Sequence, residues 1–154
     1  MKSTEAGIRF PAFGFTTDGE FWRFTAIEVL NSCGPQAYKS EMQSGMELID
    51  SDFRRWRVTS VGKLGRQWSI LAFLFLTTWT FRVELELEAQ APASWPEIQD
   101  RIATYFLGNA WNFEADGDEE ERVELRADYL RRIKGAQTLP DMFEIFGADD
   151  LMGY

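Results

Sequence analysis

Residues 79–88, WTFRVELELE, decide the fold of this 154-residue chain. Apolar and charged side chains alternate along them, which is the pattern of a strand with one buried and one exposed face. Such a half-buried strand is typical of an antiparallel sheet. The apolar face carries Trp79, Phe81, Val83, Leu85 and Leu87, and the charged face carries Arg82, Glu84, Glu86 and Glu88.

Further strands are predicted upstream of this one. The segments MELID (46–50) and FRRWRVTSV (53–61) flank the turn-forming pair Ser51-Asp52, which predicts a hairpin. Gly62 and Gly65 should end or bulge its second strand. The uncharged run WSILAFLFL that follows is compatible with a strand buried on both faces. Two interpretations of 69–88 stay open, namely a hairpin that turns at Thr77-Thr78 and one long bent strand.

Helices are predicted on both sides of the strands. In the N-terminal part we expect a short strand near 8–15 and a helix over 21–32, opened by a T-x-x-E capping box at Thr17. A second short helix is expected from Pro35, because proline is favoured in the first helical turn. On the C-terminal side, helix start and stop signals predict helices over 95–108, 119–134 and 139–146.

Consecutive strands with helices gathered at the ends predict an α+β fold. We expect a single domain, in which an antiparallel sheet of about four to five strands is covered on one face by the C-terminal helices. Its parts would be an aromatic-rich N-terminal segment (1–44), a strand meander (45–90) and a helical segment (91–147).

The charge is unevenly distributed along the chain. The formal net charge is −9. Residues 1–67 hold nine basic and eight acidic side chains, whereas residues 68–154 hold seven and seventeen, a net charge of −10. Such acidity disfavours nucleic acid and anionic membranes as partners, and it favours a basic protein.

The composition also argues against most catalytic sites. The chain has no histidine, which removes the commonest general base and metal ligand, and it has neither of the usual glycine-rich phosphate loops. The lone Cys33 is expected to be a small packed or semi-exposed side chain rather than a nucleophile. The acidic run that starts at Asp116 lacks the glycine and the terminal glutamate of a calcium loop. We therefore expect a non-catalytic protein without a cofactor or metal.

A cytoplasmic, soluble protein is expected. No secretory signal is visible at the N-terminus. The longest uncharged run, residues 67–81, is 15 residues long, shorter than the roughly 20 that span a bilayer. A single cysteine fits a reducing compartment.

The basic stretch FRRWRVTSVGK (53–63) is the sharpest local feature. Strand alternation separates Arg55 and Arg57 from Trp56, which should point to the core. We expect both arginines to pair with Glu84 and Glu86 across the sheet. The competing interpretations are a nucleic-acid contact and a pocket for a phosphate or carboxylate.

The candidate partner-binding residues follow from these charges. Aromatic residues in loops are enriched at interfaces, so we select two aromatic residues beside the acidic run and three glutamates at the start of the next helix. These residues are Trp111, Phe113, Glu119, Glu120 and Glu121. The alternative for the two aromatic residues is packing under the helices that they join.

Three function classes remain after this. The favoured one is an acidic protein-binding module, of an inhibitor, immunity-protein or adaptor type, that engages a basic partner. The second is a small-molecule-binding or enzymatic domain with a pocket near Arg55, Arg57 and Asp50. The third is an oligomeric module that pairs through an exposed strand edge.

Overall fold

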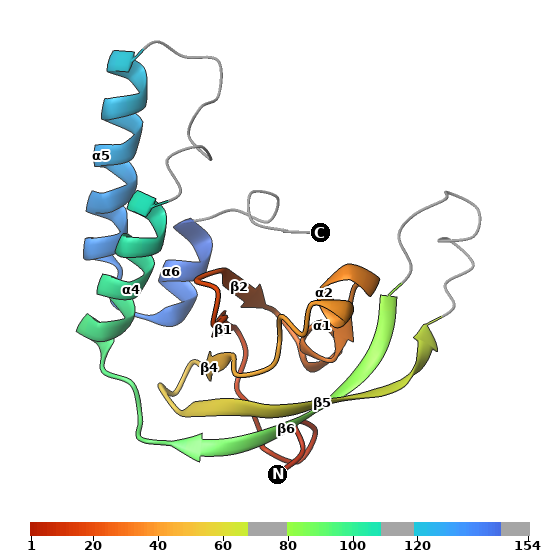
Figure 1. The fold of residues 1–154 in the computed structure, drawn as a ribbon. Coiled ribbons are helices and arrows are strands. Elements are labelled where there is room, and N and C mark those ends of the chain that lie inside the picture. Colours follow the sequence, from red (N-terminus) through yellow and green to blue (C-terminus); the bar gives the residue numbers. More distant parts are fainter. Residues whose placement is uncertain (68–79, 109–118, 146–154) are drawn as a thin grey trace.

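The computed structural model describes residues 1–67, 80–108 and 119–145. It has the predicted α+β architecture with an antiparallel sheet (Figure 1). The strand order is β2-β1-β4-β5-β6-β3, so the sheet has six strands where four to five were predicted. In chain order the elements are β1 (Ala12–Phe15), β2 (Phe21–Phe24), α1 (Ile27–Leu30), β3 (Ser32–Cys33), α2 (Pro35–Lys39), β4 (Glu47–Ile49), β5 (Arg55–Gln67), β6 (Thr80–Gln90), α4 (Trp95–Gly108), α5 (Glu119–Gly135) and α6 (Leu139–Ile145).

The helix predicted over 21–32 is wrong at both ends, because Phe21–Phe24 form strand β2 and Ser32 begins strand β3. The segment taken as a capping box is instead a tight turn between β1 and β2. Thr16 Oγ1 accepts a hydrogen bond from the Glu20 amide at 2.8 Å, and the Thr16 amide donates to the Glu20 carbonyl at 3.0 Å. Gly19 adopts φ +90°, which glycine allows without steric cost. Thr16 and Gly19 therefore close a hairpin, and within 21–32 only Ile27–Leu30 is helical.

The hairpin predicted around Ser51-Asp52 is confirmed. β4 and β5 pair antiparallel, with Leu48 opposite Trp56. β5 then continues to Gln67 through two register shifts, one between Val58 and Ser60 and one near Gly65, so the glycine-rich stretch bulges the strand without ending it. The uncharged run 68–76 lies outside the described residues, and so does the proposed turn at Thr77-Thr78.

The strand that predicted the sheet behaves as expected. In β6, Val83, Leu85 and Leu87 are buried, while the charged residues between them are partly or largely exposed. Figure 1 shows β5 and β6 as a long, bowed ribbon that extends away from the C-terminal helices.

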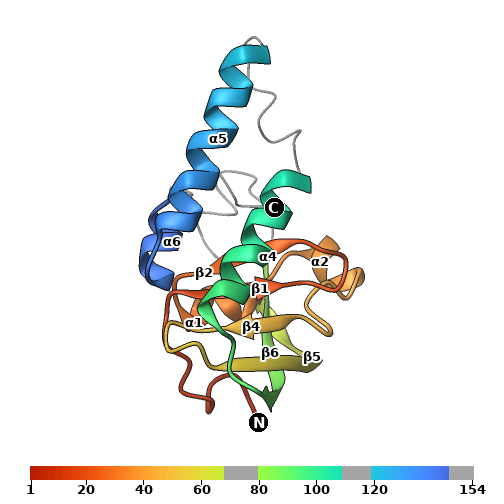
Figure 2. The same cartoon turned by 90° about the vertical axis from the view of Figure 1, so that its left-hand side faces the viewer.

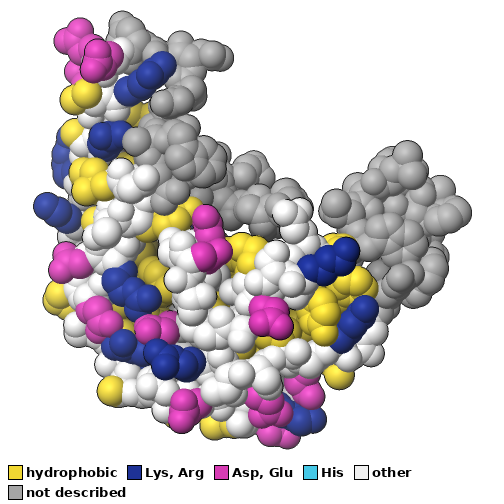
Figure 3. Space-filling model, in the orientation of Figure 1, with side chains coloured by type: hydrophobic (Ala, Val, Ile, Leu, Met, Phe, Trp, Pro, Cys, Tyr) yellow, Lys and Arg dark blue, Asp and Glu magenta, His cyan; other side chains and the backbone are white. Residues whose placement is uncertain are grey.

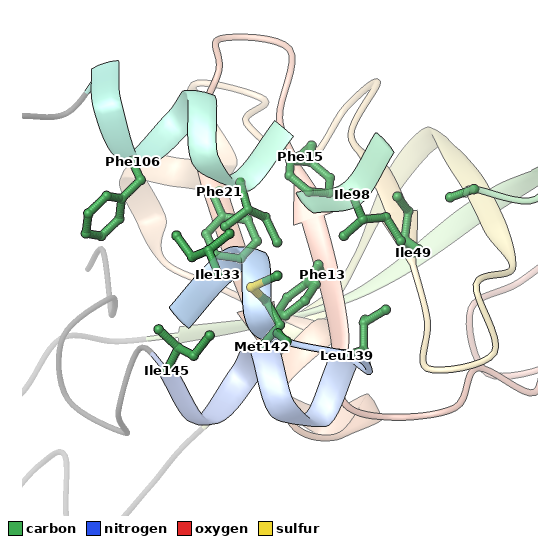
Figure 4. Packing of buried hydrophobic residues seen from close by; sticks show 13 residues of the cluster. Phe13, Phe15, Phe21, Ile49, Ile98, Phe106, Ile133, Leu139, Met142 and Ile145 are labelled. Atoms are coloured by element: carbon green, nitrogen blue, oxygen red, sulfur yellow. The ribbon is translucent and has the colours of Figure 1, made fainter. Parts of the chain in front are cut away.

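Strand β1 is buried on both faces because the sheet has a hydrophobic core on each side. Phe13 and Phe15 belong to a cluster with α4, α5 and α6, whereas Ala12 belongs to a second cluster. Figure 4 shows the first cluster, in which Phe13 lies close to Met142 of α6. The second cluster packs α1 against the inner faces of β4, β5 and β6, and its largest members include Leu30, Met46 and Trp56. All four β1 side-chain positions are buried as a result.

The C-terminal helices cover one face of the sheet, as predicted. α4, α5 and α6 stand together against β1 and β2 (Figures 1 and 2). Two of their predicted start signals form hydrogen bonds. The Glu97 amide donates to Ser94 Oγ at 3.4 Å, and Thr138 and Asp141 bond reciprocally at 3.0 and 3.2 Å, which lowers the pKa of Asp141.

Gly14→Ala should lower the free energy of unfolding by about 1–3 kcal/mol, because β1 has no room for a methyl group. A Cβ at Gly14 would lie 2.6 Å from Met46 Sδ and 2.8 Å from Phe24 Cε2, and both side chains are buried. Urea denaturation would measure the change. Gly135→Ala is the matched control, since a Cβ there meets nothing within 4 Å. Equal effects of the two substitutions would contradict the tight packing at Gly14.

Candidate functional site

Helix α5 extends beyond the elements that hold it. Of its 17 residues only Ile133 is fully buried, and every residue from 119 to 125 is exposed. Both views show the N-terminal half of α5 rising past α4 and α6 (Figures 1 and 2). Two exposed aliphatic side chains lie on this half: Val123 is 63% exposed and Leu125 is 43% exposed.

The charges of α5 are segregated along its axis. The first six residues carry four glutamates and one arginine, and Figure 3 shows acidic side chains at that end of the helix. The remaining residues carry four basic side chains and one aspartate. This order suits the helix macrodipole, so it also stabilises the helix itself.

The predicted partner-binding residues are described only in part. Glu119, Glu120 and Glu121 lie together in the exposed first turn of α5. Trp111 and Phe113 lie outside the described residues. The predicted contact patch is therefore described through its glutamates alone.

The predicted pairing of Arg55 and Arg57 with Glu84 and Glu86 is wrong. The register places Arg55 opposite Gln90 and Arg57 opposite Glu88. Because both strands are longer than expected, Glu86 and Glu84 lie farther along β5, opposite Ser60 and Gly62.

Arg55 instead finds its partners outside β6. Its Nη2 lies 2.8 Å from Glu97 Oε2 at the start of α4, and its Nη1 lies 3.7 Å from Glu47 Oε2 on β4. Glu84 is paired with Lys2, at 2.9 Å. Trp56 points to the core, as predicted. The basic strand thus has acidic partners, but they come from the strand and helix beside it.

The Asp50 carboxylate is the central hydrogen-bond acceptor of the β4–β5 turn. It is fully buried and accepts hydrogen bonds from the backbone amides of Arg9, Asp52 and Arg54 at 3.0–3.1 Å. Arg54 also donates to it through Nε at 3.0 Å and Nη2 at 2.6 Å. A carboxylate with this many donors is already satisfied, so it offers little to a ligand.

A first cleft, of about 340 Å³, lies between the β1–β2 turn and α4. Tyr105 Oη approaches Glu20 Oε2 at 3.4 Å, and burial together with this carboxylate raises the pKa of Tyr105. Arg101 is stacked on Phe15, with its guanidinium carbon 4.0 Å from the ring centroid. The cleft is lined by Phe15, Thr16, Gly19, Glu20, Asp100, Arg101, Thr104 and Tyr105.

A second cleft, of about 460 Å³, separates α2 from β5, and we call it the α2–β5 cleft. Its lining residue Gln43 is only 1% exposed. Gln43 Nε2 donates to the Leu30 carbonyl at 3.2 Å, but Oε1 has no partner among the described residues. Leaving such an acceptor unpaired costs about 1–3 kcal/mol. The cleft is lined by Cys33, Ala37, Tyr38, Lys39, Glu41, Gln43, Ser44, Thr59, Ser60 and Val61.

Sequence reasoning did not select Gln43. A glutamine two residues before a glycine carries no pattern that separates it from a solvated side chain. Only the three-dimensional packing shows that its amide is buried and half-satisfied. Neither cleft is lined by Asp50, Arg55 or Arg57.

The described residues carry few groups suited to catalysis. Burial raises the pKa of the Cys33 thiol, which keeps it protonated and a weak nucleophile. Within residues 1–67, 80–108 and 119–145, no three or more acidic or cysteine side chains are grouped so that they could hold a metal ion. None of the helices in these ranges combines the length and apolar composition needed to cross a bilayer.

Comparison with models of protein families, with curated proteins and with solved structures found no match. Any functional conclusion must therefore come from the geometry of this chain.

Proposed function

We propose that this protein is a non-catalytic binding module that engages a basic protein partner through the exposed N-terminal half of α5. Its role would be that of an inhibitor, an immunity protein or an adaptor. The observation that carries the proposal is the seven-residue exposed stretch from Glu119 to Leu125, which combines four glutamates with two exposed aliphatic side chains.

The composition of this stretch suits a protein partner. Glutamates at the end of a projecting helix attract a basic surface over a distance and raise the association rate. Exposed Val123 and Leu125 add apolar area that can be desolvated on contact. The C-terminal part of α5 is anchored by Ile133 in the core, so the exposed half is presented on a rigid support.

The alternative, a ligand pocket near Arg55, Arg57 and Asp50, is less well supported. Asp50 is saturated with donors, and Arg55 is paired with Glu97 and Glu47. A ligand there would have to displace these partners.

Replacing Glu119, Glu120 and Glu121 together by glutamine should weaken the complex by about 3- to 150-fold. Each exposed charge pair contributes roughly 0.2–1 kcal/mol, and about 1.4 kcal/mol corresponds to tenfold in affinity. The salt dependence of binding should also fall, because fewer charges attract the partner. The partner would first be captured from the native host's lysate at low and moderate salt, and its affinity then measured with both proteins purified.

The matched control is a variant with Glu5, Glu28 and Glu88 replaced by glutamine. These residues are exposed and lie away from α5, so the control changes the net charge equally. Circular dichroism must show that α5 persists, since glutamates in its first turn also stabilise the helix. If the two variants bind equally well, the start of α5 is not the contact site.

A further inference from the structure

The edge of β5 that faces away from β6 loses its strand partner after Val58. β4 pairs with Arg55–Arg57, and the chain before it stays on this edge only as far as Gly45. The last contacts are from the Val58 amide to the Met46 carbonyl at 2.9 Å and from the Gly45 amide to the Val58 carbonyl at 2.8 Å. Gly45 has φ +74°, and there the chain turns away toward α2. No strand among the described residues covers this edge beyond Val58.

Two residues of β5 direct their backbone groups toward this open edge. Val61 is opposite Leu85, and Lys63 is opposite Val83. Opposed residues in an antiparallel pair either bond to each other or both point away. The Leu85 carbonyl accepts from the Ser3 amide at 2.8 Å, and the Val83 amide donates to the Asn31 carbonyl at 2.8 Å, both on the far side of β6. The amides and carbonyls of Val61 and Lys63 therefore point to the open edge.

The α2–β5 cleft lies where the missing strand would run. Thr59, Ser60 and Val61 form its β5 side, and residues of α2 and of the segment before Gly45 form the other. Figure 1 shows α2 lying over this part of β5.

Gln43 supplies an independent sign of a ligand in this cleft. The Leu30 carbonyl can only accept a hydrogen bond, so it fixes the amide group of Gln43 with Nε2 toward Leu30 and Oε1 on the other side. Gln43 is a lining residue of the cleft, and its buried Oε1 has no hydrogen-bond partner among the described residues.

We propose that the α2–β5 cleft binds an extended peptide segment of another protein as an added strand on the open edge of β5. A peptide backbone offers the alternating donors and acceptors that Val61 and Lys63 require, and an N–H or O–H group of the peptide pairs with Gln43 Oε1. A small molecule could satisfy Gln43 but would leave most of the edge unpaired. The volume of about 460 Å³ is within the usual range for binding clefts.

Lys39 and Glu41 are the charged side chains that line the cleft. Both are exposed and carry opposite charges, so the cleft does not select a peptide by net charge. The hydroxyl groups of Ser44, Thr59 and Ser60 favour small polar side chains on the bound strand. This peptide site lies apart from α5 and goes beyond the proposed function, because it requires neither a basic partner nor the glutamates of α5.

The test begins with a displayed library of random heptapeptides selected on the full chain. A synthetic copy of a selected peptide is then titrated into the ¹⁵N-labelled protein. We expect shift changes concentrated at 59–64 and 37–45. Val61→Pro should weaken binding by at least about tenfold, since it removes an edge-facing amide without removing a bond to β6. Gln43→Met should weaken it several-fold, because it removes the buried acceptor while conserving volume.

Two controls keep the proposal falsifiable. The first control is the same peptide with alternate backbone nitrogens methylated, which retains its side chains but loses its strand-pairing donors. It should not bind the unmodified protein, and this result does not depend on whether Val61→Pro folds. The triple glutamine variant of α5 should bind the peptide as the parent does, which separates this site from the proposed function. Failure to select any peptide, shifts located elsewhere, full binding by the methylated peptide, or concentration-dependent dimers with the same shifts would overturn the proposal.

Discussion

Asp50→Ala is expected to lower the free energy of unfolding by about 3–5 kcal/mol. The substitution removes the acceptor of three backbone amides, those of Arg9, Asp52 and Arg54, and of the Arg54 guanidinium. The Arg54 guanidinium keeps the Gly7 carbonyl as an acceptor, at 2.6 Å, whereas the three backbone amides lose the carboxylate that accepts from them. Equilibrium urea denaturation, with the slope compared between variants, measures the loss.

Asp52→Ala is the matched control for this prediction. Asp52 lies in the same turn, but its side chain is exposed and pairs with the exposed Arg9, at 3.0 Å. Its loss should cost less than about 1 kcal/mol. A similar cost for the two substitutions would mean that solvent, rather than Asp50, satisfies the turn.

Phe13→Ala should cost about 3–5 kcal/mol, the range for emptying a buried phenylalanine site. Phe13 is fully buried, with its ring centroid 5.0 Å from that of Phe21 and 6.3 Å from that of Phe143. The cavity would lie between β1 and α6, where neighbouring strands and helices limit collapse (Figure 4). Thermal and urea denaturation would both report it.

Leu64→Ala provides the comparison for Phe13→Ala. Leu64 is 60% exposed on β5, so its truncation should change stability by no more than about 0.5 kcal/mol. If Phe13→Ala were as mild, the contact between the sheet and α6 would contribute little to stability.

The elements with strong periodicity were predictable from the sequence, and the reason is physical. The strand β6 has one buried and one partly exposed face, so apolar residues recur at every second position, as Val83, Leu85 and Leu87 do. The C-terminal helices carry start and stop signals that act within a few residues, and their bounds were predicted closely.

The features that could not be predicted from the sequence depend on contacts between residues far apart in the chain. Strand β2 was missed because its sequence fits a helix locally, and only pairing with β1 decides between the two. The partners of Arg55 were missed because the register depends on the full length of β5 and β6, and because Glu97 is distant in the chain. The unpaired Oε1 of Gln43 has no sequence signature at all.

Strand β1 has a consequence for how this protein tolerates change over evolution. Its four side-chain positions face two hydrophobic interiors in alternation, so no position in it can accept a polar residue without disturbing one of them. By contrast, residues 119–125 of α5 are exposed. Sequence drift can therefore accumulate at the end of α5, which under the proposed function would change the affinity for the partner, while the strand that joins the two cores stays fixed.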